Sequence, residues 1–111
     1  MKTFVITGAS DGIGAEIARQ LAARHKQDAA LVLAARNEAL LEAVATQCRG
    51  LGAQALAVRT DVSDAAQCRA LIDTAAVRFG GITALINNAG MSAQALLEEV
   101  KAEDLAWYED L

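Results

Sequence analysis

The 111-residue sequence contains no proline, one histidine, two cysteines and few aromatic residues, which make up 4% of the chain. The absence of proline excludes collagen-like and proline-rich chains. Cys48 and Cys68 stand alone, without a CxxC pair, and therefore fit neither a disulfide framework nor a thiolate metal site. We expect both thiols to be core residues and predict no metal site.

Long apolar runs and an excess of basic charge are also missing. No run approaches the roughly 20 residues that a membrane span needs. The first residues show no apolar signal core, which predicts a cytoplasmic protein without a membrane partner. Ten Lys and Arg residues against 14 Asp and Glu residues give a net charge of −4, with no basic patch of the kind that nucleic-acid-binding proteins carry. We therefore expect no nucleic acid partner.

Apolar residues, at 54% of the chain, are numerous enough for one folded domain over residues 1–111. Short β-rich runs alternate with longer helical runs. The predicted strands cover residues 3–7, 31–35, 53–60 and 82–86, and the predicted helices cover 12–26, 38–51, 65–79 and 101–111. Helix caps are expected at Asn37 and at Ser63 or Asp64, and Gly80 is expected to end the third helix.

The apolar spacing within each predicted helix indicates which face is buried. The first helix is expected to bury Ile13, Ile17 and Leu21. The corresponding residues of the next two helices are Leu40, Leu41, Val44, Cys48 and Leu51, and then Cys68, Leu71, Ile72, Ala75 and Phe79.

The predicted strands lack polar alternation, which is typical of parallel strands buried on both faces. Strands that alternate with helices, joined by right-handed crossovers, predict a doubly wound parallel α/β fold. We expect the sequence to stop after the fourth strand and part of the next helix, leaving that strand as an exposed apolar edge. Such a chain should be marginally stable and prone to associate.

A glycine-rich turn connects the first strand to the first helix. The sequence Thr7–Gly14 reads TGASDGIG, with glycines at 8, 12 and 14. Gly8 permits a tight turn, Gly12 lets a ligand approach the backbone, and Gly14 lets the helix pack closely. The free N–H groups of the helix start suit a pyrophosphate. The alternative is a strand-to-helix turn that binds nothing.

The end of the second strand carries Arg36 and Asn37, with no acidic residue. An acid at this place favours NAD, whereas an arginine accommodates the 2′-phosphate of NADP. The residues therefore favour NADP over NAD, although Asp11 brings a negative charge into the glycine turn. The alternative for Arg36 is a solvated surface residue.

Polar residues also follow the third and fourth strands, at the edge where open α/β sheets bind ligands. Asp61 can accept a hydrogen bond from an adenine amino group, and Val62 follows it. The fourth strand ends in Asn87-Asn88-Ala89-Gly90, whose asparagines can fix neighbouring backbone. Capping and turn formation are the alternative roles of these residues.

Together these motifs resemble the short-chain dehydrogenase/reductase family over essentially the whole chain. TGASDGIG matches the cofactor turn, Arg36 the NADP-type position, Asp61-Val62 the adenine-side pair, and NNAG the fourth-strand motif. The resemblance implies an NADP-dependent oxidoreductase that acts on a carbonyl or alcohol substrate, usually as a homo-oligomer. The residues expected to bind the cofactor are Gly8, Ser10, Asp11, Gly12, Ile13, Gly14, Arg36, Asn37, Asp61, Val62, Asn88, Ala89 and Gly90.

The catalytic set of that family is not found in this sequence. The family uses an Asn, a Ser and a Tyr-x-x-x-Lys pair, but Tyr108 is the only tyrosine and Ser92 follows NNAG too closely. Trp107 and Tyr108 are interpreted as helix packing residues, and His25 as a residue at a helix end. We therefore predict no catalytic residue within the chain, which would supply the cofactor-binding half of a reductase.

Three other classes stay open. A non-catalytic nucleotide-binding module needs the same turn without the chemistry. A class I methyltransferase also has a glycine-rich first turn, but it needs an acid where this chain has Arg36. A receiver domain has a similar size and needs acids after the first strand, where this chain has Gly8, Ala9 and Ser10.

Overall fold

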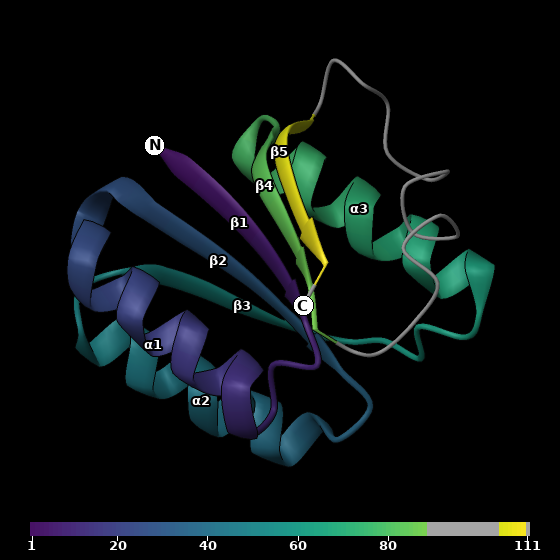
Figure 1. Cartoon of the computed structure of the whole chain (residues 1–111), viewed down its shortest axis with the longest axis horizontal. Coiled ribbons are helices and arrows are strands. Elements are labelled where there is room, and N and C mark those ends of the chain that lie inside the picture. Colours follow the sequence, from purple (N-terminus) through teal and green to yellow (C-terminus); the bar gives the residue numbers. More distant parts are fainter. Residues whose placement is uncertain (89–104, 111) are drawn as a thin grey trace.

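The computed structural model describes residues 1–88 and the backbone of 105–110. Five parallel strands form one sheet in the order β3-β2-β1-β4-β5, with helices on both faces (Figure 1). The predicted doubly wound parallel α/β fold is therefore confirmed. The elements are β1 (Lys2–Thr7), α1 (Gly12–His25), the 3-10 turn η1 (Lys26–Asp28), β2 (Ala29–Ala35), α2 (Glu38–Gly50), β3 (Gln54–Arg59), α3 (Ala65–Phe79), β4 (Ile82–Asn87) and β5 (Leu105–Asp110).

The helix ends follow local capping chemistry. Asn37 Oδ1 accepts a hydrogen bond from Leu40 N at 3.1 Å and begins α2, as predicted. Of the two candidate caps of α3, the structure selects Asp64, whose carboxylate accepts from Ala66 N at 2.9 Å. Gly80 ends α3 in the left-handed conformation, at φ +80°, which favours glycine.

The buried face of α1 differs from the prediction. Ile13 is 68% exposed, while Ile17 and Leu21 are only partly buried. The residues buried against the sheet are instead small, namely Gly14, Ala15, Ala18 and Ala22. Small side chains let the helix axis lie close to the strands, so the larger residues are displaced to the flank. A smaller correction applies to α2, where Leu40 and Leu51 are exposed while Leu41, Val44 and Cys48 are buried.

Two apolar cores lie on opposite faces of the sheet. Alternate residues of the strands point to α1 and α2 on one face, for example Leu31 and Leu33 of β2. Their neighbour Val32 points to α3 on the other face, where it packs with Leu71. Both cysteines are buried, Cys48 in the first core and Cys68 in the second, as predicted.

The prediction of a helix over 101–111 is wrong for its described part. Residues Leu105–Asp110 form strand β5, which pairs in parallel with β4, Ile82 opposite Leu105 and Asn87 opposite Asp110. Without a neighbour, β4 would leave the N–H and C=O groups of its outer edge unpaired. A segment containing Trp107 and Tyr108 suits a strand that pairs with them. Hence β4 is not the edge strand that was expected. The expected packing of Trp107 and Tyr108 in a helix is overturned with it.

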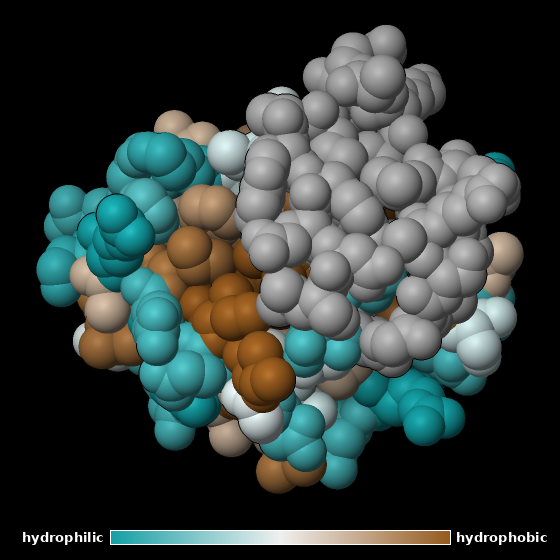
Figure 2. All heavy atoms as spheres, in the orientation of Figure 1, coloured by the Kyte–Doolittle hydropathy of each residue, from teal (hydrophilic) through white to brown (hydrophobic). Residues whose placement is uncertain are grey.

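A hydrophobic band lies beside α1 on the viewed face (Figure 2). The partly buried side chains of Ile17 and Leu21 line a shallow hollow on α1. Such apolar surface favours association. The marginal stability and association expected from the sequence stay predictions, which thermal melting and sedimentation test.

Candidate functional site

The candidate site lies at the carboxyl edge of the sheet, where the loops after β1, β2 and β3 meet. β1 is the central strand of the sheet. The chain adds β2 and β3 on one side of it and β4 and β5 on the other, so the order of strand addition reverses between β1 and β4. Open α/β sheets bind ligands at such a switch point. Backbone hydrogen bonds join the loops, from Ala9 N to Ala34 O at 3.2 Å and from Thr60 N to Ala35 O at 2.9 Å.

The glycine turn needs all three glycines, for two different physical reasons. Gly8 and Gly12 have φ values of +62° and +56°, a region that side chains disfavour. A Cβ on Gly14 would lie 2.2 Å from Gly8 O, so only glycine fits there. A Cβ on Gly12 would meet nothing within 4 Å, which leaves its outer side open to a ligand.

The first turn of α1 keeps its N–H groups available. Asp11 occupies the cap position in an extended conformation, and its side chain makes no capping hydrogen bond. A helix start without a side-chain cap presents donors and a positive dipole end, which suit an anion. The turn therefore has the donors and the space for a phosphate group.

A buried hydrogen-bond network holds the glycine turn against β4. The Thr7 hydroxyl donates to Asn87 Oδ1 at 2.9 Å and accepts from Asn88 N at 3.0 Å. The Asn88 carboxamide then donates through Nδ2 to Gly8 O at 3.3 Å. Thr7 and Asn87 are both fully buried. The expectation that the asparagines fix neighbouring backbone is thus confirmed for Asn88, whereas the Asn87 side chain accepts from the Thr7 side chain.

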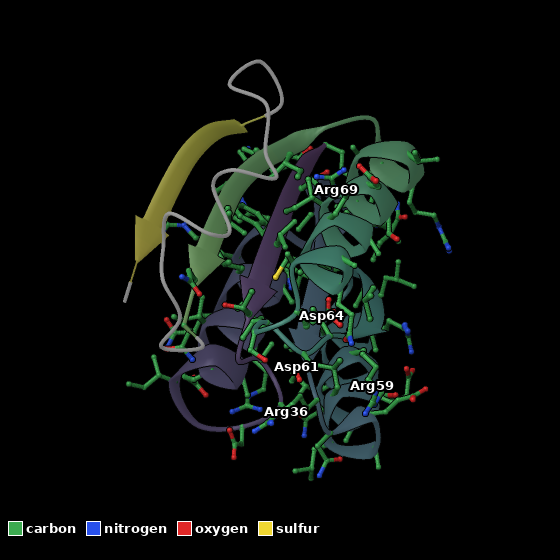
Figure 3. All side chains as sticks on the ribbon, turned by 90° about the vertical axis from the view of Figure 1, so that its right-hand side faces the viewer. Arg36, Arg59, Asp61, Asp64 and Arg69 are labelled. Atoms are coloured by element: carbon green, nitrogen blue, oxygen red, sulfur yellow. The ribbon has the colours of Figure 1, made fainter. Side chains whose placement is uncertain are left out.

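A hollow of about 320 Å³ lies beside this turn. Its lining comes from the ends of three strands: Gly8, Ala35, Arg36, Thr60, Asp61, Val62 and Ser63. Arg36 and Asp61 lie together at this end of the molecule, with Arg59 beside them (Figure 3). The site combines one anion-binding turn with a neighbouring pocket of mixed charge.

Asp61 is held in its ionised form by its own turn. Its Oδ1 accepts from the Ser63 hydroxyl at 2.6 Å and from Ser63 N at 3.0 Å. These two hydrogen bonds lower the pKa of the Asp61 carboxyl, and the positive charges of Arg36 and Arg59 lower it further. Its Oδ2 and the Val62 N–H have no hydrogen-bond partner within residues 1–88. An acceptor and a donor are thus left for a ligand.

Most of the predicted residues lie at this edge, in different surroundings. Asp11, Gly12, Ile13 and Arg36 are exposed, and Asn37 is committed through its oxygen to capping α2. Part-buried residues of the same loops are Gly8, Ser10, Asp61, Val62 and Asn88. Ala89 and Gly90, like Ser92, lie outside the described residues.

Sequence reasoning missed two residues that build the site. Ser63 holds the Asp61 carboxylate, and Gln67 accepts a hydrogen bond from Asp61 N at 2.7 Å. The sequence offered Ser63 only as a candidate helix cap and gave no signal for Gln67. Within residues 1–88 no cluster of three His, Cys, Asp or Glu side chains is arranged to hold a metal. No described helix is long and apolar enough to cross a membrane.

The fold and this edge define a doubly wound α/β protein with a ligand site at the carboxyl ends of its strands, and comparison with known proteins narrows this class. The short chain dehydrogenase family model matches residues 2–109. The chain therefore belongs to the short-chain dehydrogenase family, which separates it from methyltransferases and receiver domains.

Relatives and solved structures agree with that family. The chain is 46% identical over 110 residues to 11-beta-hydroxysteroid dehydrogenase A of Sesamum indicum. This match covers 98% of the present chain but 30% of that protein. The chain is 40% identical over 105 residues to sepiapterin reductase of Chlorobaculum tepidum, in a match that covers 91% of this chain and 43% of that protein. The structure of an alcohol dehydrogenase from Thermococcus sibiricus, solved with 5-hydroxy-NADP, superposes on this chain with a TM-score of 0.75 at 36% identity. The superposition covers 94% of this chain and 43% of that one. The chain thus spans less than half the length of these proteins.

Proposed function

We propose that this protein is an NADP-dependent oxidoreductase that transfers hydride between the nicotinamide and a carbonyl or alcohol substrate. Residues 1–111 supply its cofactor-binding half. Membership of the short-chain dehydrogenase family supports the reaction class. The observation that carries the choice of NADP is Arg36, which follows β2 beside the glycine turn without an acid at that strand end.

The residues present fit a dinucleotide. The uncapped first turn of α1 and the open side of Gly12 receive the pyrophosphate. Asp61 Oδ2 accepts from the adenine amino group and Val62 N–H donates to the adenine ring. When bound, the nicotinamide supplies the hydride acceptor or donor.

Arg36 sets the choice between the two cofactors. It is exposed at the rim of the hollow, and its planar group can donate two parallel hydrogen bonds to a phosphate. The nearby Asp61 carboxylate accepts a hydrogen bond from Ser63, and within residues 1–88 it forms no ion pair with Arg36. The arginine is therefore left for the 2′-phosphate that distinguishes NADP from NAD.

Parallel titration of the chain with NADPH and NADH tests the proposal. NADPH should bind more tightly, and Arg36→Ala should cost NADPH about 1.5–3 kcal/mol, or roughly 10- to 100-fold, with little effect on NADH. Arg78→Ala removes an equal charge from the distant end of α3 and is the matched control. Equal or tighter binding of NADH by the unaltered chain would overturn the choice of NADP.

The reaction and the assembly are tested on the full product of the gene. Turnover of simple ketones with NADPH is expected, whereas cofactor binding without turnover would favour a non-catalytic nucleotide-binding module. The homo-oligomer that the resemblance implies stays a prediction, which sedimentation of the same protein tests.

A further inference from the structure

We infer that Ser63 and Gln67 are positioning residues that make the cofactor pocket selective for adenine over other purines. This inference rests on the proposed function, because it concerns the base of the same dinucleotide. Neither residue is assigned a hydrogen bond to the base, although Ser63 lines the hollow. Each acts through Asp61 and Val62, the two groups that read the base.

Ser63 selects which carboxylate oxygen of Asp61 is available. Both of its hydrogen bonds go to Oδ1, from the hydroxyl at 2.6 Å and from the backbone at 3.0 Å. A carboxylate that accepts two hydrogen bonds at one oxygen cannot rotate freely about its χ2 torsion. Oδ2 is therefore directed away from the turn and keeps its acceptor capacity for a ligand.

Gln67 fixes the backbone on which Asp61 and Val62 stand. Its Oε1 accepts from Asp61 N at 2.7 Å, and its Nε2 donates to Asp64 Oδ2 at 3.1 Å. Asp64 in turn caps α3. The Asp61 backbone is thus tied to the first turn of a helix that packs against the sheet, which limits its movement.

The two groups held in this way match one purine and oppose another. Adenine presents an amino donor beside a ring-nitrogen acceptor, which complements Asp61 Oδ2 and the Val62 N–H. Hypoxanthine presents a carbonyl acceptor beside a ring N–H, so both pairs become mismatched. A rigid pocket enforces this difference, whereas a loose one lets the carboxylate turn away from the carbonyl of the wrong base.

The test compares NADPH with its reduced hypoxanthine analogue, binding each to the chain by calorimetry. The unaltered chain should prefer NADPH. Ser63→Ala should reduce that preference about three- to tenfold, the value of one ordinary hydrogen bond, and Ser63→Thr should restore it. Thr74→Val removes a hydroxyl that donates to Ala70 O within α3 and is the matched control. Gln67→Leu should reduce the preference as Ser63→Ala does.

A second measurement reads the positioning without cofactor. The carboxyl carbon of Asp61, followed by NMR, should titrate at higher pH in Ser63→Ala than in the unaltered chain and return toward the original midpoint in Ser63→Thr. An unchanged Asp61 midpoint, or equal weakening of NADPH and the hypoxanthine analogue, would overturn the inference. If the unaltered chain binds neither dinucleotide, the proposed function itself fails.

Discussion

The turn after β1 and the turn after β3 border the same hollow but are built by opposite means. The first is shaped by missing side chains, since Gly8 and Gly12 adopt φ values that side chains disfavour and Gly14 lies where a Cβ would clash. The second is shaped by side chains that are present, since Ser63 and Gln67 hold Asp61 through hydrogen bonds. One substitution in the first turn should therefore cause a large loss of stability and NADPH binding, whereas each substitution in the second should weaken binding by a smaller amount.

The largest effect is expected in the glycine turn. In Gly14→Ala the new Cβ would lie 2.2 Å from Gly8 O and 2.7 Å from Asn88 Nδ2, so the start of α1 must move away. Overpacking of this kind costs about 1–3 kcal/mol, which lowers Tm by on the order of 10 °C in a domain of this size. Calorimetry should also show no NADPH binding.

Gly50→Ala is the matched control for that substitution. Gly50 is the last residue of α2, and a Cβ there meets nothing within 4 Å. Because alanine favours helix more than glycine does, Tm should be unchanged or slightly higher. A Gly14→Ala chain that melts like Gly50→Ala would contradict the account of a turn that tolerates no Cβ.

A smaller loss is expected when the buried network behind the glycine turn is broken. Thr7→Val keeps the shape of the side chain but removes the donor to Asn87 Oδ1 and the acceptor for Asn88 N. Buried polar groups that lose a partner cost about 1–3 kcal/mol. Urea unfolding should show this loss, together with weaker NADPH binding. Thr74→Val, on the outer side of α3, should unfold like the unaltered chain.

The smallest effects separate the two aspartates, which should act with opposite sign. Asp61→Asn places an amide donor where the adenine amino group needs an acceptor and should weaken NADPH several-fold. Asp11→Asn removes a negative charge beside the phosphates and should strengthen binding about two- to threefold, less at high salt. Titrations at two salt concentrations measure both. A change of NADPH affinity in the same direction for both variants would contradict the assignment of the two turns.

The pH dependence follows from the lowered pKa of Asp61. A carboxyl with a lowered pKa in the folded chain adds stability above its unfolded pKa, and loses it as the pH falls through the folded value. Between neutral pH and about pH 5 the carboxylate stays ionised, so its contribution to NADPH binding should be constant there. A fall in affinity tied to Asp61 within that window would contradict the hydrogen-bonding scheme.

Local chemistry explains how much of this could be predicted from the sequence. Asn37, Asp64 and Gly80 are capping residues whose effect depends on a few neighbours, so their helix ends were found. The three glycines mark their turn in the same way. The buried alanines of α1 gave no such signal, because the larger Ile13, Ile17 and Leu21 dominate the apolar pattern.

Long-range pairing explains what could not be predicted. The short segment Leu105–Asp110 is compatible with helix or strand, and its contact with the edge of β4 decides the outcome. Gln67 looks like any polar residue in a first helical turn until the fold brings its amide to Asp61 N. Both features depend on where the backbone of another element lies, which residue spacing does not encode.

From the hydrogen bonds between the glycine turn and β4 we also expect an order of events during folding. The Thr7 hydroxyl and Asn87 are separated by 80 residues, whereas β1 meets β2 far sooner along the chain. Contacts between distant residues carry the larger loop-closure entropy and form late. On the ribosome, β1, β2 and β3 can assemble before Asn88 has emerged. We expect the glycine turn to gain its final support only when β4 arrives, so that the proposed dinucleotide site is completed late in folding.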